Sequence, residues 1–178
     1  LIDIYVTQKG ITTSITGDVL VGQDADLTIK AKTYYKHDIL TGTDKNDLIL
    51  GGEGSDRLVG GKGDDILIGG NGLDVYVVDG NDRIIDSDGQ GIVVDKNGNL
   101  IAGEFTKPSG SSTYTWQTDS TVTATKNSPL TLYLPDGSSV VIEDHANNGD
   151  FGIYLTEETT PATALHLQGD LAPLDTDP

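Results

Sequence analysis

The chain has no cysteine and no methionine among its 178 residues, and it has no apolar run that approaches the length of a membrane span. Without cysteine, disulfides, thiolate metal sites and cysteine nucleophiles are excluded. Because a membrane-spanning helix needs about 20 mostly apolar residues, the sequence predicts no transmembrane segment. Since the first residue is Leu1 and no leader is visible, we expect the chain to be a segment of a longer protein.

Basic side chains are also scarce. The chain has 11 Lys and Arg against 28 Asp and Glu, which gives a formal net charge of -17 at pH 7. A surface this negative repels phosphate backbones and anionic membranes, so we expect no nucleic-acid partner, and it attracts cations. Glycine is abundant at 23 residues, and the hydrophobic content of 35% argues against a chain that is disordered throughout.

The glycines keep a fixed period of nine residues from Gly42 to Gly69. The four units read GTDKNDLIL, GGEGSDRLV, GGKGDDILI and GGNGLDVYV. The sixth position is always aspartate: Asp47, Asp56, Asp65 and Asp74. The eighth position is always large and apolar: Ile49, Leu58, Leu67 and Tyr76. A string of ordinary β-hairpin turns is the alternative interpretation, but such turns do not hold two positions together at a fixed period.

Each unit divides into a six-residue turn and a three-residue strand. Glycine permits backbone conformations with positive φ and lets neighbouring turns stack closely. The middle residue of each strand points inward, and two units complete one coil, so units two apart stack on the same side. Calcium takes about six to eight oxygen ligands, so one turn offers half of a site and two stacked turns offer a complete one.

This G-G-x-G-x-D-x-U-x pattern resembles the RTX (repeats-in-toxin) family of haemolysin-type calcium-binding repeats. The resemblance implies an all-β fold, a short calcium-bound parallel β-roll with β-rich flanking segments, and several Ca²⁺ ions between stacked turns. It implies that sixth-position carboxylates hold the ions, Asp47 paired with Asp65 and Asp56 with Asp74. It also implies ligation by loop carbonyls, for which the candidates are Gly52, Gly54, Gly61, Gly63, Gly70 and Gly72.

The period extends beyond the four units in both directions. Upstream, TYYKHDILT (33–41) has no glycine but places Asp38 sixth, where it would share an ion with Asp56. Downstream, the next aspartate of the pattern, Asp82, comes one residue earlier than the period of nine places it, and it is expected to stack on Asp65. Asp86 and Asp88 follow in another acidic turn, for which metal ligation and a solvated loop are both open interpretations.

Four segments are expected: a β-rich N-terminal flank (1–37), the β-roll (38–90), a β-rich C-terminal cap (91–155) and a linker-like tail (156–178). Residues 82–89, 113–116, 141–144 and 148–153 resemble, more loosely, the segment that follows RTX repeats and caps their open end. The dipeptide at 97–98, Asn-Gly, predicts a hairpin. Five aromatic residues of the cap are predicted to be core: Phe105, Tyr114, Trp116, Tyr133 and Tyr154.

Outward-facing positions of the odd units are all apolar: Leu48, Leu50, Ile66 and Ile68. Exposed patches of this kind are rare on soluble monomers, so we expect a cover. The first candidate cover is the flanks of the chain itself, and the second is another domain of the parent protein.

No catalytic signature is present in the sequence, neither H-E-x-x-H nor G-x-S-x-G, and we expect no enzyme activity in this segment. We expect residues 42–90 to be largely disordered without calcium and to fold on extracellular calcium. The resemblance implies a larger secreted bacterial protein, such as a toxin, adhesin or exoenzyme, exported by type I secretion from a Gram-negative cell. The alternative roles are an adhesin module that binds a host-cell surface and calcium-dependent self-cleavage at Asp177-Pro178.

Overall fold

The computed structural model describes residues 3–8, 11–16, 19–21, 28–30, 37–126, 129–143 and 145–158. Over this part of the chain the elements are strands, apart from one short 3-10 turn, η1 (Asp150–Gly152). No helix long and apolar enough to cross a membrane occurs within these ranges. The prediction of an all-β fold is therefore confirmed.

Eleven strands precede the C-terminal lobe: β1 (Asp3–Gln8), β2 (Ile11–Thr16), β3 (Val19–Val21), β4 (Thr28–Lys30), β5 (Ile39–Thr41), β6 (Leu48–Glu53), β7 (Arg57–Val59), β8 (Ile66–Asn71), β9 (Asp74–Val78), β10 (Arg83–Ile85) and β11 (Gly91–Asp95). The lobe contains β12 (Leu100–Ile101), β13 (Gly103–Lys107), β14 (Thr113–Trp116), β15 (Thr123–Lys126), β16 (Leu130–Tyr133), β17 (Ser139–Ile142) and β18 (Ile153–Glu157).

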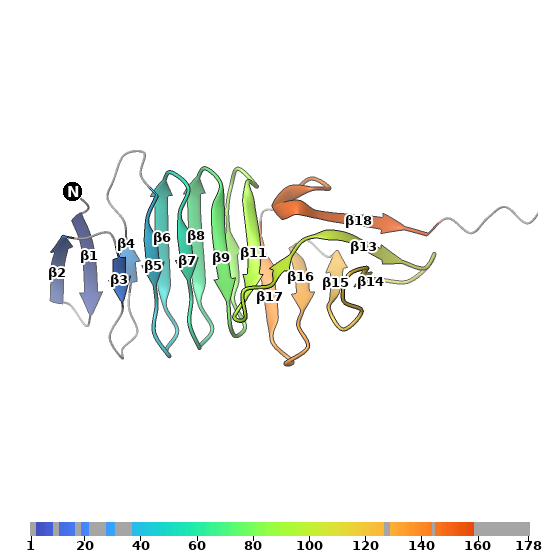
Figure 1. Ribbon diagram of the computed structural model, residues 1–178, viewed down its shortest axis with the longest axis horizontal. Coiled ribbons are helices and arrows are strands. Elements are labelled where there is room, and N and C mark those ends of the chain that lie inside the picture. The colour runs from blue at the N-terminus through green and yellow to red at the C-terminus, as the bar shows by residue number, and fades with distance from the viewer. Residues whose placement is uncertain are drawn as a thin grey trace, which may run out of the picture.

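From β3 to β11 the chain winds as a parallel solenoid, seen in Figure 1 as strands stacked along the long axis. Successive strands alternate between two sheets, with β4, β6, β8 and β10 in one and β3, β5, β7, β9 and β11 in the other. Units two apart lie in register, so that Ile49 pairs with Leu67 and Leu58 with Tyr76. The predicted parallel β-roll is thereby confirmed, with odd and even units in opposite sheets.

The solenoid is longer than the glycine pattern. Val19 pairs with Ile39 and Thr28 with Leu48, both in parallel register, which adds β3 and β4 upstream of the expected roll. At the other end β11 pairs in parallel with β9. Because a parallel ladder needs only extended backbone of matching length, these strands join the roll without glycine-rich turns. The β1–β2 hairpin then continues one sheet, and β2 was not predicted.

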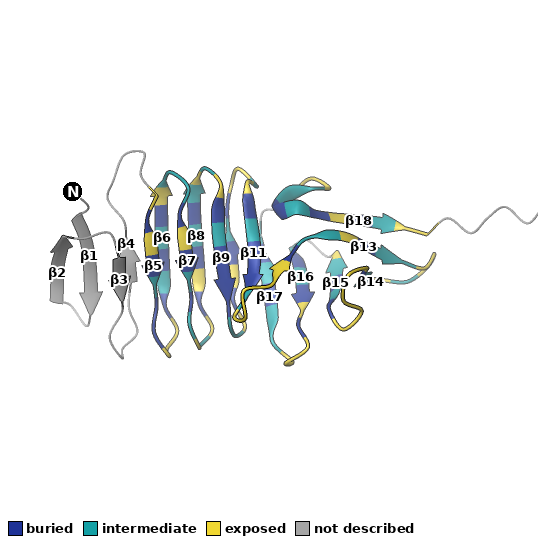
Figure 2. Ribbon diagram, viewed as in Figure 1, coloured by how far each residue is buried: buried dark blue, intermediate teal, exposed yellow. Residues whose placement is uncertain are grey.

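The eighth-position side chains form the centre of the solenoid, where Figure 2 shows the dark-blue band along the strands. Leu40, Ile49, Leu58, Leu67 and Tyr76 are all 0% exposed. Since each points into the gap between the two sheets, the fixed period places one large apolar side chain in the core for each half-coil.

The C-terminal lobe is mostly antiparallel, with one parallel pair between β13 and β18. It joins the solenoid through the parallel pair of β10 with β17 and the antiparallel pair of β11 with β12. The stacked rings of Phe105 and Trp116 lie in its core with centroids 6.0 Å apart, and Tyr114 is buried beside them. Tyr133 and Tyr154, which were predicted to be core, are 43% and 50% exposed. That part of the prediction is wrong, because strand alternation turns these two side chains outward while their neighbours face inward.

The outward apolar positions of β6 and β8 are not covered by the strands of the flanks that the structure describes. The flanking strands extend the sheet sideways, β4 beside β6 and β17 beside β10. Leu48, Leu50 and Ile68 are consequently half-buried, and Ile66 is exposed. Strand β18 also continues to Glu157, beyond the expected start of the tail.

Candidate metal centre

The sixth-position aspartates form two ladders, one in the odd units and one in the even units, whose strands lie in opposite sheets. The backbone N–H of Asp47 donates to Oδ1 of Asp65, and that of Asp56 donates to Oδ1 of Asp74, both at 2.8 Å. Each ladder has a third member: the Asp38 N–H donates to Asp56 at 2.8 Å in the even units, and the Asp65 N–H donates to Asp82 at 3.0 Å in the odd units. The structure thus stacks the carboxylates in the predicted pairs, and each first oxygen is oriented by a backbone amide.

The second carboxylate oxygen, Oδ2, is the unusual atom of these ladders. In Asp56, Asp65 and Asp74 it is buried and accepts no hydrogen bond. Buried polar atoms normally have a partner, since leaving one without costs about 1–3 kcal/mol. Asp47 differs, because Thr43 stands where later units have glycine and donates its backbone N–H and hydroxyl to Asp47 Oδ2. Three buried carboxylate oxygens without donors are therefore available to a cation.

Oxygen atoms from stacked units converge beside the first glycine of the first two units, Gly42 and Gly51. A Cβ atom added to Gly51 would lie 2.6 Å from the carbonyl oxygen of Gly69 and 2.7 Å from Oδ2 of Asp56. The equivalent point at Gly42 is bounded by the Gly60 carbonyl and Asp47 Oδ2. A carboxylate and a carbonyl from units two apart thus face one small space that only glycine leaves open. Hard oxygen donors from both layers are the ligands that calcium prefers, so these residues fit the ion.

The predicted loop-carbonyl ligands lie in the turns that enclose these spaces. Gly61, Gly63, Gly70 and Gly72 all have positive φ, between 96° and 122°. A Cβ on Gly70 or Gly72 would collide with the carbonyl oxygen of Gly52 or Gly54, respectively. The carbonyls of Gly52 and Gly54 therefore point toward the turn two units later, and the Gly63 carbonyl points toward Gly80 in the same way.

Burial changes the acidity of the ladders. With only protein groups around them, desolvation raises the pKa of Asp56 to about 6 and the pKa of Asp65 and Asp74 to about 7, and repulsion from the stacked carboxylates adds to it. Burial also raises the pKa of Asp82 to about 6. A cation in contact with these groups favours the ionised form and offsets both effects.

The acidic turn at 86–88 closes the last coil. Asp86 Oδ1 accepts the N–H groups of Asp88 and Gly89, both at 3.2 Å, and its Oδ2 accepts the Tyr76 hydroxyl at 2.7 Å. Asp88 is exposed, and its Oδ2 accepts the N–H of Gly72 at 2.9 Å. Both side chains have protein donors, so their geometry explains a structural turn, and their role as calcium ligands stays a prediction.

Phe151 covers the same end of the solenoid. It has a φ of 57°, is 1% exposed, and its ring centroid lies 6.1 Å from that of Tyr76. Its backbone N–H donates to the Gly89 carbonyl at 3.2 Å. Sequence reasoning placed Tyr76 in the core but missed Phe151 and the contact of the Tyr76 hydroxyl with Asp86. The signal was a tyrosine in the eighth position, where the other units carry a purely aliphatic side chain.

Removing the Tyr76 hydroxyl tests whether its contact with Asp86 stabilises this end of the solenoid. We expect Tyr76→Phe to lower the free energy of unfolding by about 1–3 kcal/mol, because it leaves a buried Asp86 oxygen without its donor. Tyr133→Phe, which removes a hydroxyl from an exposed ring, is the matched control and should change little. Urea unfolding in saturating calcium measures both variants, and equal midpoints for the two would contradict the closing role.

Side chains at the variable turn positions also pair between units two apart. Lys62 Nζ lies 2.8 Å from Asp44 Oδ2, and Asn71 Nδ2 donates to Glu53 Oε1 at 2.9 Å. Exposed pairs of this kind contribute little energy. Their consistent spacing keeps the stacked turns in one register beside the aspartate ladders.

Across the described ranges no three histidine, aspartate or glutamate side chains gather into a metal cluster. No curated protein and no solved structure matches the chain. Residues 41–76 match the family model described as RTX calcium-binding nonapeptide repeat (4 copies). Residues 41–76 are therefore RTX calcium-binding nonapeptide repeats.

Proposed function

We propose that this chain is a calcium-dependent folding module of a larger secreted bacterial protein, and that several Ca²⁺ ions bind between its stacked turns. The observation that carries the proposal is the row of buried Oδ2 atoms in Asp56, Asp65 and Asp74, none of which accepts a hydrogen bond. RTX nonapeptide repeats bind calcium, which matches the need of these oxygens for a cation.

When bound, calcium supplies positive charge and coordination for oxygens that the protein leaves without donors. The chain's own residues prepare the site. Backbone amides hold each Oδ1 and so fix the direction of the carboxylate, as the Asp47 N–H does for Asp65. Glycines leave space for the approach of neighbouring turns, and the eighth-position side chains bury the strands once the turns are stacked.

Without the ion, the free-energy balance favours the unfolded chain. Several nearly fully buried carboxylates stand one above another, and each of the first three units buries only one large apolar side chain. Ordering a residue costs about 1–2 kcal/mol of backbone entropy, and glycine loses the most freedom of all residues. Calcium binding therefore supplies the free energy of folding. A module of this kind stays unfolded during export by type I secretion and folds in the calcium outside a Gram-negative cell.

In this role the segment is not catalytic, and activity belongs to other domains of the parent protein, which are its expected partners. Two other roles remain expectations from the sequence. Binding to a host-cell surface, through the apolar face of β6 and β8 or through the C-terminal lobe, is the first. Self-cleavage at Asp177-Pro178 is the second, and that bond lies outside the described residues.

Calorimetric titration with calcium tests the proposal through two neighbouring carboxylates. Asp65 is 1% exposed and belongs to one of the two ladders, whereas Asp64 is exposed and belongs to a variable position. We expect Asp65→Asn to weaken calcium binding by at least about tenfold and to reduce the number of ions bound, because a neutral amide is a poorer ligand than a carboxylate. Asp64→Asn removes the same charge and should titrate like the unmodified chain.

Two results would contradict the proposal. The first is an unmodified chain that binds no calcium under these conditions. The second is an Asp65→Asn variant that binds the same number of ions with the same affinity as Asp64→Asn.

A further inference from the structure

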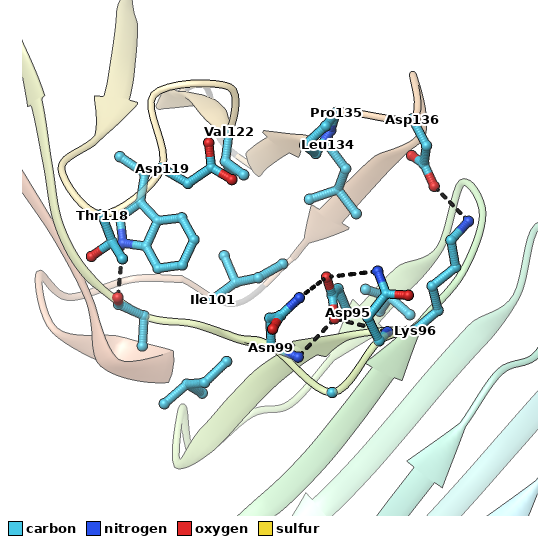
Figure 3. A pocket seen from close by; sticks show the side chains of 16 residues that line it. Asp95, Lys96, Asn99, Ile101, Thr118, Asp119, Val122, Leu134, Pro135 and Asp136 are labelled. Atoms are coloured by element: carbon cyan, nitrogen blue, oxygen red, sulfur yellow. Dashed lines mark hydrogen bonds and ion pairs between the residues drawn. The ribbon is translucent and has the colours of Figure 1, made fainter.

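The C-terminal lobe contains a pocket of about 840 Å³ that shares no residue with the aspartate ladders. It forms where three connections meet: the β11–β12 hairpin, the segment between β14 and β15, and the β16–β17 turn. Figure 3 shows Thr118 and Asp119 on one side of the pocket, with Asn99 and Lys96 on the opposite side and Ile101 between them.

The floor of the pocket is apolar and fixed in place. Ile101, Val122 and Leu134 line it and are 2%, 3% and 9% exposed. Trp116 adds an aromatic wall, and its indole is held on two sides. The Nε1–H donates to the Ala102 carbonyl at 2.9 Å, and the ring stacks on Phe105. A rigid apolar surface of this kind suits the hydrocarbon part of a ligand.

The rim is polar and carries more negative than positive charge. Three carboxylates, from Asp95, Asp119 and Asp136, line the pocket together with one ammonium group, that of Lys96. Lys96 Nζ lies 2.8 Å from Asp136 Oδ2 and 2.9 Å from Asp79 Oδ1, so this cation is already engaged. The rim therefore repels anionic ligands and attracts cationic ones.

Asp119 is the carboxylate of the rim that the protein leaves available. Its Oδ1 accepts the Thr121 hydroxyl at 2.6 Å and the Thr121 N–H at 2.9 Å. These bonds lower the pKa of Asp119 and keep the group ionised. It forms no ion pair within the described ranges, whereas Asp136 is paired with Lys96 and Asp95 accepts the amides of Asn97 and Asn99.

We propose that this pocket binds a basic side chain, arginine in particular, presented by a peptide segment of a partner protein. The aliphatic stem lies on the apolar floor, and the guanidinium reaches Asp119 at the rim. Arginine is favoured because its planar head is weakly hydrated and matches a carboxylate with two parallel hydrogen bonds. The site goes beyond calcium binding, and it gives the module a way to hold a partner once it is folded.

The chain has a single tryptophan, Trp116, and it lines the pocket, so its fluorescence reports binding there directly. The experiment titrates the full chain, in saturating calcium, with the acetylated and amidated peptide alanine-arginine-leucine-alanine. A second peptide carries citrulline, a neutral isostere, in place of arginine. We expect the arginine peptide to change the Trp116 emission saturably, and the citrulline peptide to bind at least about tenfold more weakly, as expected for loss of a charge-assisted contact.

Asp119→Asn is the matched variant, because the amide oxygen still accepts from Thr121 while the charge is lost. We expect it to weaken the arginine peptide about tenfold and to leave the citrulline peptide unchanged. Glu158→Gln removes one charge from an exposed residue outside the pocket and should bind like the unmodified chain. Circular dichroism in calcium confirms that each variant is folded.

The proposal is overturned by equal affinity for the two peptides, by the absence of any emission change, or by an Asp119→Asn variant that binds like Glu158→Gln. Titration with a panel of neutral disaccharides is the remaining arm. A saturable response to a disaccharide with none to the arginine peptide overturns the proposal in favour of a glycan site. Calcium affinity is measured in the same samples, so failure of the pocket is distinct from failure of the calcium sites.

Discussion

In a calcium chelator the chain is expected to lose the β-sheet circular dichroism of the solenoid, and to regain it in one cooperative step as calcium is added. The reason lies in the carboxylate ladders. Asp56, Asp65 and Asp74 are each at most 2% exposed and each keeps one oxygen without a donor. A buried charge without a partner costs several kcal/mol, whereas a whole domain is stable by only about 5–15 kcal/mol. The free-energy cost of three such groups therefore exceeds the stabilisation that the packing of short strands supplies.

The step is expected to be cooperative because each aspartate takes part in two layers. Asp65 accepts the amide of Asp47 through Oδ1, and its own amide donates to Asp82. An ion that orders one pair of turns thus fixes one half of the next site. Arrays in which each unit contacts only its neighbours propagate order in this way.

Magnesium is the control for this titration, because it prefers a compact octahedral shell and retains its water. We expect it to restore little of the signal at concentrations where calcium restores all of it. Hydrogen exchange adds a local measurement. The amide hydrogens of Asp47, Asp56 and Asp65, which donate to carboxylates in the next coil, should become protected only with calcium. A full β-sheet spectrum and protected amides in chelator would contradict the expected dependence.

The repeat region is the part of this fold that sequence alone predicts well. A strict period of nine fixes which residues point inward, so the buried row from Ile49 to Tyr76 and the stacked aspartates follow from the spacing. Every contact repeats the previous one, and an error in register would expose the whole row. Period and physical chemistry therefore determine the solenoid jointly.

The flanks lack this redundancy. Strand β3 pairs with β5 and strand β4 pairs with β6, each at a spacing of 20 residues (39 − 19 and 48 − 28). Neither β3 nor β4 carries the glycine pattern, so the roll was predicted to begin too late. In the C-terminal lobe, alternation predicts that neighbouring side chains face opposite ways but does not say which face is covered. Tyr133 and Tyr154 were misplaced for this reason, since the parts of the chain that pack on one face of the sheet, and not the alternation itself, decide which side chains are buried.

The candidate site was predictable in its carboxylates and less so in its surroundings. The pairs Asp47–Asp65 and Asp56–Asp74 follow from two units per coil. The contact between Tyr76 and Asp86 depends on how the chain turns after the last unit, where the period contracts by one residue. The pocket near Trp116 joins three connections that are distant in sequence, and no local pattern brings them together.

Gly70→Ala is expected to destabilise the calcium-loaded solenoid by at least about 3 kcal/mol, while Gly52→Ala costs about 1–2 kcal/mol. The two glycines occupy the same position in units two apart and pair with each other between strands β6 and β8. Their φ values are 110° for Gly70 and 111° for Gly52. Both substitutions therefore carry the same penalty for an alanine in a left-handed conformation. They differ only in what the new methyl group meets.

At Gly70 the methyl group would collide with the carbonyl oxygen of Gly52 and lie 2.8 Å from its carbonyl carbon, whereas at Gly52 it meets nothing within 4 Å. The atoms that this methyl group would contact belong to the backbone, so the collision is removed only if the two turns separate. That separation would pull apart the oxygens that are proposed to share a calcium ion. Gly70→Ala should consequently weaken calcium binding as well as stability, and Gly52→Ala should change stability alone. Thermal unfolding at several calcium concentrations measures both effects. Equal calcium dependence in the two variants would mean that close stacking of the turns does not determine the affinity.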